Sequence, residues 1–140
     1  MQTAQEIMHS GAQCIAESQT LAQAAELMRD LGVGALPICG EDDRLTGIIT
    51  DRDIVVKCVA QGLDPATTTA GDLAQGRPMV IEGSDDIEQV LRVMEQHRVR
   101  RLPVIEHPSH KLIGMISEAD VARHLSQARV AEFVTSICAE

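Results

Sequence analysis

Aromatic residues are almost absent from this chain of 140 residues: Phe133 is the single aromatic, and there is no tryptophan or tyrosine. The core must therefore be aliphatic, and a bound nucleobase would find no tryptophan or tyrosine to stack on. Basic residues are also scarce, since 12 Lys and Arg stand against 21 Asp and Glu, for a net charge of −9. This balance excludes general nucleic-acid binding, which needs a basic surface.

Long apolar runs and cysteine motifs are lacking too. No stretch approaches the roughly 20 apolar residues that span a bilayer. The beginning of the chain has no basic segment followed by an apolar one, so we expect a cytoplasmic protein with no membrane attachment. Four cysteines without a Cys-x-x-Cys spacing indicate neither a disulfide scaffold nor a zinc site.

One motif occurs twice. Residues 47–53 (GIITDRD) read as a buried strand that runs directly into a helix, and residues 114–120 (GMISEAD) repeat the pattern. Each copy follows a strand with a Leu-Pro pair, at 36–38 and at 102–104. In both copies a hydroxyl residue precedes an aspartate by three positions at the expected start of the helix. These pairs are Thr50 with Asp53, and Ser117 with Asp120.

The order of the predicted elements repeats with the motif, as helix, strand, helix, two hairpin strands and helix. We expect capping boxes at Thr3 and Thr20, a short strand over Gln13–Ile15, and a helix after Asp53 with Ile54, Val55 and Cys58 facing inward. The predicted class is α/β (α+β), with a small three-stranded mixed sheet and two main helices in each unit. The predicted organisation is unit 1 at 1–62, a linker at 63–69, unit 2 at 70–126, and an amphipathic C-terminal helix at 127–140.

The repeated motifs resemble those of a tandem pair of cystathionine-β-synthase (CBS) domains, known as a Bateman module, over residues 1–126. This resemblance implies two pseudo-symmetric units packed together and a regulatory role without catalysis. It also implies a homodimer that needs no cofactor, binds an AMP-, ADP- or ATP-type ligand in clefts between its domains, and acts in trans on a protein partner. The stretches 35–40 and 50–55 are similar to those of stand-alone CBS pairs of the hypoxic response type, which implies stress adaptation.

The hydroxyl–carboxylate pairs have two interpretations. They can simply cap their helices, or the exposed carboxylates of Asp53 and Asp120 can accept hydrogen bonds from a ribose diol. The turn 98–101, with Arg100 and Arg101, is either a phosphate clamp or a solvated turn balanced by glutamates. Because the matching turn of the first half carries no charge, we expect Asp120 to matter more than Asp53 for a phosphorylated ligand. The resemblance implies base contacts near Ile15, Pro37, Ile81 and Pro103.

Cys14 and Cys39 lie on strands that we expect to be neighbours. They are either two buried thiols, as is normal in the cytosol, or a disulfide or redox switch, if their Cα atoms come within about 7 Å. His107 and His110 could share a metal with His97, but the sequence shows no set of four ligands, so a polar hairpin loop is favoured over a metal site. Two other functions remain open: a structural or protein-interaction module with vacant clefts, and a thiol-based redox protein.

Overall fold

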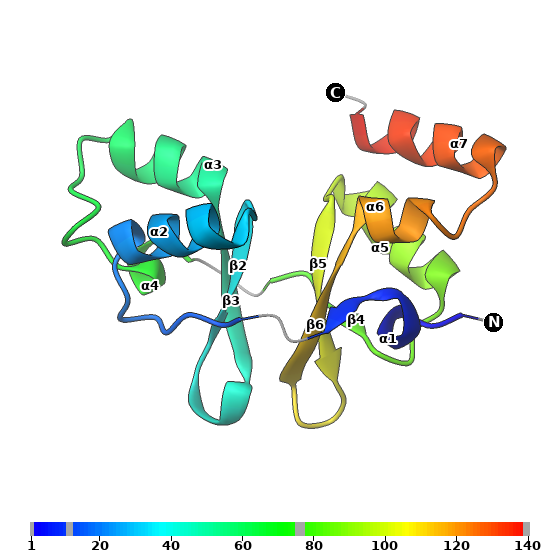
Figure 1. Ribbon diagram of the computed structural model, residues 1–140, viewed down its shortest axis with the longest axis horizontal. Helices are drawn as coiled ribbons and strands as arrows, with labels where there is room; N and C mark the ends of the chain where they lie inside the picture. Colours follow the sequence, from blue (N-terminus) through cyan, green and yellow to red (C-terminus); the bar gives the residue numbers. More distant parts are fainter. Residues whose placement is uncertain (1, 11–12, 75–77, 139–140) are drawn as a thin grey trace. The chain divides into compact units, whose positions relative to one another are not determined.

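The structure is a computed structural model that describes residues 2–10, 13–74 and 78–138. The chain divides into two compact units (Figure 1). We call residues 13–78 the Asp53 unit, and residues 1–12 with 79–140 the Asp120 unit, after the aspartates of the repeated motif. Each unit is described by itself.

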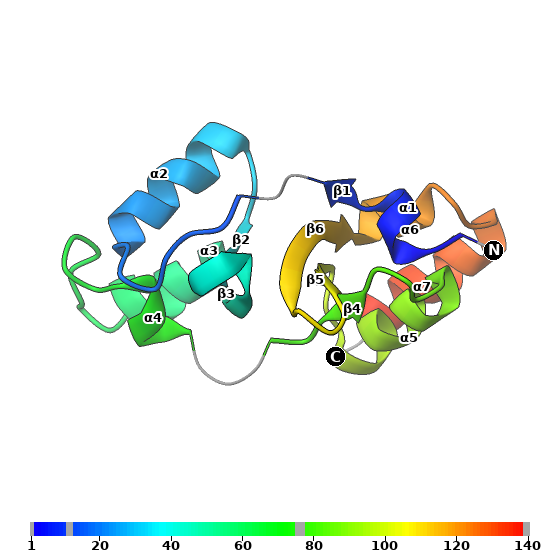
Figure 2. The ribbon, with the colours of Figure 1, turned by 90° about the horizontal axis from the view of Figure 1, so that it is seen from below.

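The Asp120 unit is built on a sheet with the strand order β1-β6-β5-β4 (Figures 1 and 2). β5 (Arg101–Glu106) and β6 (Lys111–Ser117) form an antiparallel hairpin. β4 (Ile81–Glu82) runs parallel to β5, and β1 (His9–Ser10) runs antiparallel to β6. The predicted mixed α/β fold is confirmed, although this sheet has a fourth strand, β1, that the sequence did not indicate.

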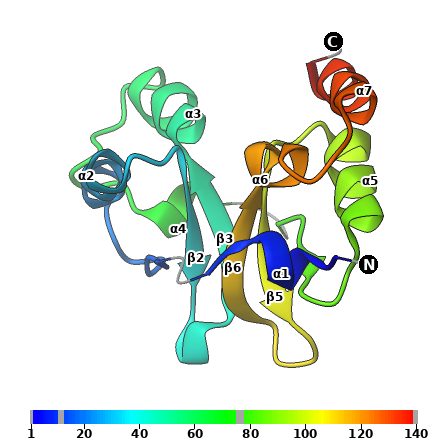
Figure 3. The same cartoon turned by 45° about the vertical axis from the view of Figure 1, so that its right-hand side comes forward.

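Four helices accompany this sheet: α1 (Ala4–Ile7), α5 (Ile87–His97), α6 (Glu118–Ala122) and α7 (Gln127–Cys138). Val90, Leu91 and Met94 recur at helical spacing on α5 and are fully buried, as expected for an amphipathic helix. Helix α7 packs on α5 (Figure 3) and buries Phe133 in the same apolar cluster. The only aromatic side chain of the chain therefore joins α7 to the core of this unit.

The Asp53 unit has a smaller sheet, in which β2 (Ala35–Cys39) pairs antiparallel with β3 (Leu45–Thr50). The strand expected over 13–15 is reduced to one parallel bridge between Ile15 and Ile38. The other elements are α2 (Leu21–Leu31), η1 (Glu41–Asp43), α3 (Asp51–Asp53), the π-helical η2 (Ile54–Val59) and α4 (Ala70–Leu73).

The opening helices of the two sequence repeats are exchanged. Helix α1 belongs to the Asp120 unit, where the Ala4 amide donates to the Asp85 carbonyl at 2.7 Å. Helix α4, which opens the second repeat, lies in the Asp53 unit, where the Ala70 amide donates to the Gln19 carbonyl at 2.8 Å. The boundaries of the compact units therefore differ from those of the repeats in the sequence.

Two local expectations are wrong. The side chain of Thr3 does not cap α1. Its hydroxyl donates to the Glu6 carboxylate at 3.1 Å and accepts no hydrogen bond from the amides of the helix. Val55 points outward and is 59% exposed. The cause is the π-helical turn, in which the Ala60 amide reaches the Val55 carbonyl five residues back; the wider turn rotates side chains away from the α-helical pattern.

Candidate functional site

Both copies of the motif form a capping box at a helix start. The Asp53 amide donates to the Thr50 hydroxyl at 3.1 Å, and the Thr50 amide donates to Asp53 Oδ2 at 3.0 Å. The corresponding distances for Asp120 and Ser117 are 3.2 and 2.9 Å. The capping interpretation is therefore confirmed for both pairs, and any ligand must use the acceptor positions that capping leaves free.

The Asp120 carboxylate has no free acceptor position. Its side chain is 1% exposed. Oδ2 accepts from the Ser117 amide at 2.9 Å and from the Ser117 hydroxyl at 3.0 Å. Oδ1 lies 2.9 Å from His9 Nε2 and 2.5 Å from Arg123 Nη2. These four partners fill the about four lone-pair positions of a carboxylate.

The Asp53 carboxylate is more accessible, with 24% of its side chain exposed. Among the described residues its partners are the Thr50 amide and Lys57, whose Nζ lies 3.3 Å from Oδ1. The repeat places Val56 where the Asp120 unit has Arg123, and a valine side chain cannot donate a hydrogen bond. Gln75, the counterpart of His9, lies outside the described residues.

The arginine-rich turn lies beside the start of α6. The carbonyl of Arg100 accepts from the Glu118 amide at 2.8 Å, and Arg101 pairs with Ser117 across the hairpin. Both arginines are exposed, and Arg100 Nη2 lies 3.6 Å from Cys138 Sγ. No carboxylate within the described ranges lies within 4 Å of a guanidinium of this turn. Two glutamates that could have balanced this turn, Glu88 and Glu95, face Arg129 on α7 instead.

The four residues expected near a base are buried in their own units. Ile15 and Ile81 are 2% and 1% exposed, and the side chains of Pro37 and Pro103 are also buried. The Ile15 amide donates to the Pro37 carbonyl at 2.9 Å, which brings these two residues together. Ile81 lies opposite Val104 on the neighbouring strand, next to Pro103.

Cys14 and Cys39 form a disulfide with a Cα–Cα distance of 5.5 Å. The sequence left two alternatives open for this pair, a disulfide or two reduced thiols, and the structure has the disulfide. The bond ties the segment before α2 to the end of β2, next to Ile15. Cys58 is a buried free thiol and Cys138 an exposed one, so neither is paired.

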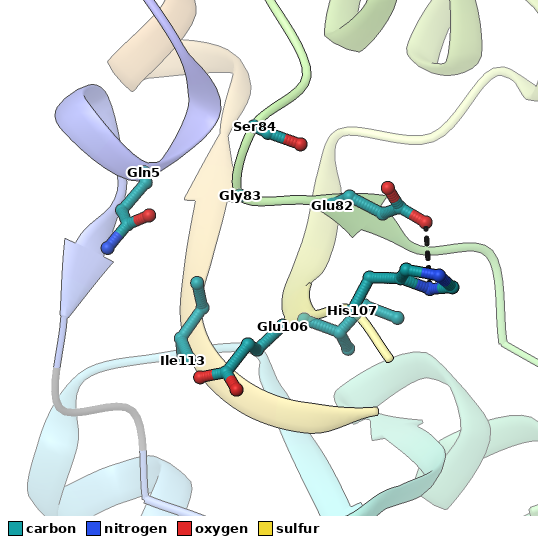
Figure 4. Close-up of a pocket in the computed structure, with 8 residues that line it drawn as sticks. Gln5, Glu82, Gly83, Ser84, Glu106, His107 and Ile113 are labelled. Carbon is teal, nitrogen blue, oxygen red and sulfur yellow. Dashed lines mark ion pairs between the residues drawn. The ribbon is translucent and has the colours of Figure 1, made fainter. Parts of the chain in front are cut away.

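A pocket of about 190 Å³ lies near the turn of the β5–β6 hairpin (Figure 4). Its lining includes Glu82, Glu106 and His107, with His107 Nδ1 3.5 Å from Glu82 Oε1. Gly83 also lines the pocket. A Cβ at this position would lie 2.9 Å from Ile113 Cδ1, so a larger residue would require Ile113 to move. Two carboxylates make this pocket unfavourable for phosphate, so it is no substitute for a nucleotide site at Asp120.

No three His, Cys, Asp or Glu side chains of residues 2–10, 13–74 and 78–138 come together as a metal site. Within the same residues, no helix has the length and apolar character needed to cross a bilayer.

Comparison with known proteins identifies the family. The CBS domain profile matches residues 4–59 and 70–127. The chain belongs to the CBS domain family. It is 51% identical to hypoxic response protein 1 of Mycobacterium tuberculosis over 138 residues, which is 99% of this chain and 95% of that protein. The expected resemblance to a stand-alone CBS pair of the hypoxic response type is confirmed.

Two solved CBS structures are informative about ligands. Hypoxic Response Protein I with two coordinated zinc ions is 53% identical, covers 89% of this chain and 100% of that chain, and has a TM-score of 0.81. CBSX2 in complex with AMP is 25% identical, covers 92% and 99%, and has a TM-score of 0.77.

The sequence did not indicate two residues of the Asp120 site in this CBS pair. Arg123 follows Asp120 by three positions on a helix, a spacing that brings side chains together, and this signal could have been noticed. His9 reaches Asp120 only because β1 pairs with β6, with His9 opposite Met115. Nothing in local sequence periodicity predicts a pairing between such distant segments.

Proposed function

We propose that this CBS pair is a regulatory protein that binds an adenosine nucleotide, with the ribose diol held by Asp53. The accessible carboxylate of Asp53 is the observation that carries the proposal. It is fixed by the capping box at one oxygen and has 24% of its side chain exposed to solvent. Two ribose hydroxyl groups are hydrogen-bond donors that suit such a carboxylate. The AMP complex of the related CBSX2 supports an adenosine ligand.

Lys57 is the residue that we assign to the phosphate. Its ammonium group, 55% exposed, lies 3.3 Å from Asp53 Oδ1 and can move on its flexible stem. In a chain of net charge −9, a phosphate needs a local cation of this kind. Arg100 and Arg101 stay a proposed phosphate clamp of the Asp120 unit.

Nucleotide binding acts through its differential affinity for two states of the pair, which a partner protein then distinguishes. We assign no catalytic residue. A homodimer is favoured by apolar side chains exposed on the Asp53 unit, since a second copy can cover them. They are Leu31, Val33, Val55, Val56, Val59 and Leu63. Sedimentation of Val55→Asp with Val59→Asp should show monomers; an unchanged dimer would reject this surface.

The proposal is tested by isothermal titration of AMP, ADP and ATP into the protein and into Asp53→Asn. The asparagine oxygen can still accept from the Thr50 amide, so the helix start is kept. The side-chain NH2 group then takes the place of Oδ1 and cannot accept from the diol, so we expect affinity to fall by roughly tenfold or more, as for the loss of hydrogen bonds to a charged group.

Asp51→Asn is the matched control, because Asp51 lies in the same helical turn and, among the described residues, its carboxylate accepts only a local bond from the Arg52 amide. It should bind as the unaltered protein does. Equal affinities of Asp53→Asn and the unaltered protein would reject Asp53 as the ribose ligand. Absence of binding for all three nucleotides would favour the interaction module.

A further inference from the structure

The Asp120 carboxylate differs from its counterpart in what lies over it. His9 and Arg123, with side chains 75% and 61% exposed, hold a carboxylate that is 1% exposed. Both therefore cover Asp120 from the solvent side. The capping box needs neither of them, because Asp53 forms the same box with Thr50. The helix start is already capped without His9 and Arg123, so their contribution is to cover the carboxylate of Asp120.

Gly114 allows the strand that carries His9 to lie this close. A Cβ at position 114 would lie 2.6 Å from the His9 carbonyl oxygen and 2.5 Å from Met8 Sδ. Such contacts are too short for any side chain, so β1 can pair with β6 only beside a glycine. At the equivalent Gly47, the nearest atom to an added Cβ is Ala74 Cβ at 3.2 Å. The glycine of the second motif is therefore required by the backbone of β1.

We propose that His9 and Arg123 form a latch that closes Asp120 to ribose, so that a nucleotide binds the Asp53 unit first and reaches Asp120 only when β1 releases His9. The latch rests on the proposed function. Its chemistry is competition: a ribose diol at Asp120 must replace the bonds from His9 Nε2 and Arg123 Nη2 to Oδ1. The two sites of the pair consequently differ in order of filling.

The first experiment needs no ligand. Carboxylates are modified with a water-soluble carbodiimide and an amine, and the modified residues are found by peptide mass spectrometry. Asp120 should react on the order of tenfold more slowly than Asp53, because access controls the reaction and their side chains are 1% and 24% exposed. His9→Ala should remove this protection. Equal reactivity of the two aspartates, or protection that survives His9→Ala with Arg123→Ala, would overturn the latch.

His107→Ala is the matched control, because His107 is a 72% exposed histidine of the same unit that also faces a carboxylate. It should leave Asp120 protected. Gly114→Ala is a second route to the open state, since its Cβ displaces the His9 backbone; Asp120 should become reactive although His9 is present. Retained protection in Gly114→Ala with circular dichroism unchanged would contradict the role of β1.

The second experiment is titration with AMP. The unaltered protein should bind one nucleotide per chain through Asp53, and His9→Ala should bind two, the second lost on Asp120→Asn. In the Asp53→Asn background, binding should return when His9→Ala is added but not when His107→Ala is added. One site in both the unaltered protein and His9→Ala would overturn the latch while leaving the proposed function intact. Binding of AMP by the His9→Ala variant but not by the unaltered protein would support the latch and reject Asp53 as the first site.

Discussion

Two helix starts with the same motif differ in what a ligand can reach. Thr50 with Asp53 and Ser117 with Asp120 cap their helices with nearly equal distances, yet one aspartate is 24% exposed and the other 1%. His9 and Arg123, which lie outside the shared hydroxyl–aspartate spacing, contact only the buried aspartate, Asp120. A repeated motif therefore predicts the backbone of a site better than its accessibility.

The two units also differ in how they are stabilised. The Asp120 unit is covered by α7, which brings Phe133 into its core. The Asp53 unit has instead a disulfide between Cys14 and Cys39, and it leaves apolar side chains such as Val55 and Val59 exposed. Burial of apolar surface and chain cross-linking are different sources of stability, and variants can separate them.

The largest expected effect is that of Phe133→Ala. Removing this fully buried ring should lower the free energy of unfolding by about 3–5 kcal/mol, because it deletes apolar contacts and leaves a cavity. Urea denaturation measures the loss, and hydrogen exchange should localise it to the Asp120 unit. Val134→Ala is the control, since Val134 is 45% exposed and its truncation should change little. Similar losses for both variants would show that α7 is not anchored by Phe133.

The second effect concerns the disulfide. Replacing Cys14 and Cys39 together with serine should lower the free energy of unfolding by roughly 3 kcal/mol, as expected for a cross-link between residues 25 apart. Dithiothreitol should destabilise the unaltered protein by a similar amount and leave the double variant unaffected. The effect should fall on the Asp53 unit. Four titratable thiols in the unreduced, denatured protein would contradict the disulfide.

The smallest expected effect is the difference in free energy of unfolding between alanine variants of the two aspartates. Asp120→Ala should cost about 2–3 kcal/mol, because it removes the cap together with the bonds from His9 and from the charged Arg123. Asp53→Ala should cost about 1 kcal/mol, the usual value for a lost capping interaction. Denaturant titration of both variants measures the difference. A larger loss for Asp53→Ala would mean that the contacts around Asp120 contribute little to stability.

Much of the fold follows from local signals in the sequence. Capping boxes at Thr20, Thr50 and Ser117 were predicted from their spacing and are present. Thr69 also forms a capping box, with Asp72, that was not predicted. Its backbone and hydroxyl groups lower the pKa of the Asp72 carboxyl. The apolar face of α5 was likewise visible in its periodicity. These features depend on residues a few positions apart, so a single sequence is enough to predict them.

The features that the sequence did not reveal depend on distant contacts. The pairing of β1 with β6 brings His9 to Asp120, and our proposal that Asp53 binds ribose first rests on this contact. The outward position of Val55 depends on the π-helical turn of η2. Neither a two-residue strand nor a π-turn has a periodic pattern long enough to detect.

The exchange of α1 and α4 between the repeats has a consequence for how the chain is made. On the ribosome, residues 13–78 emerge as one continuous stretch that holds every element of the Asp53 unit, so this unit can fold while translation continues. Helix α1 precedes this stretch in the chain but has to wait for β4 and β6, its neighbours in the finished unit. A segment that is synthesised before the Asp53 unit thus reaches its place after that unit has formed.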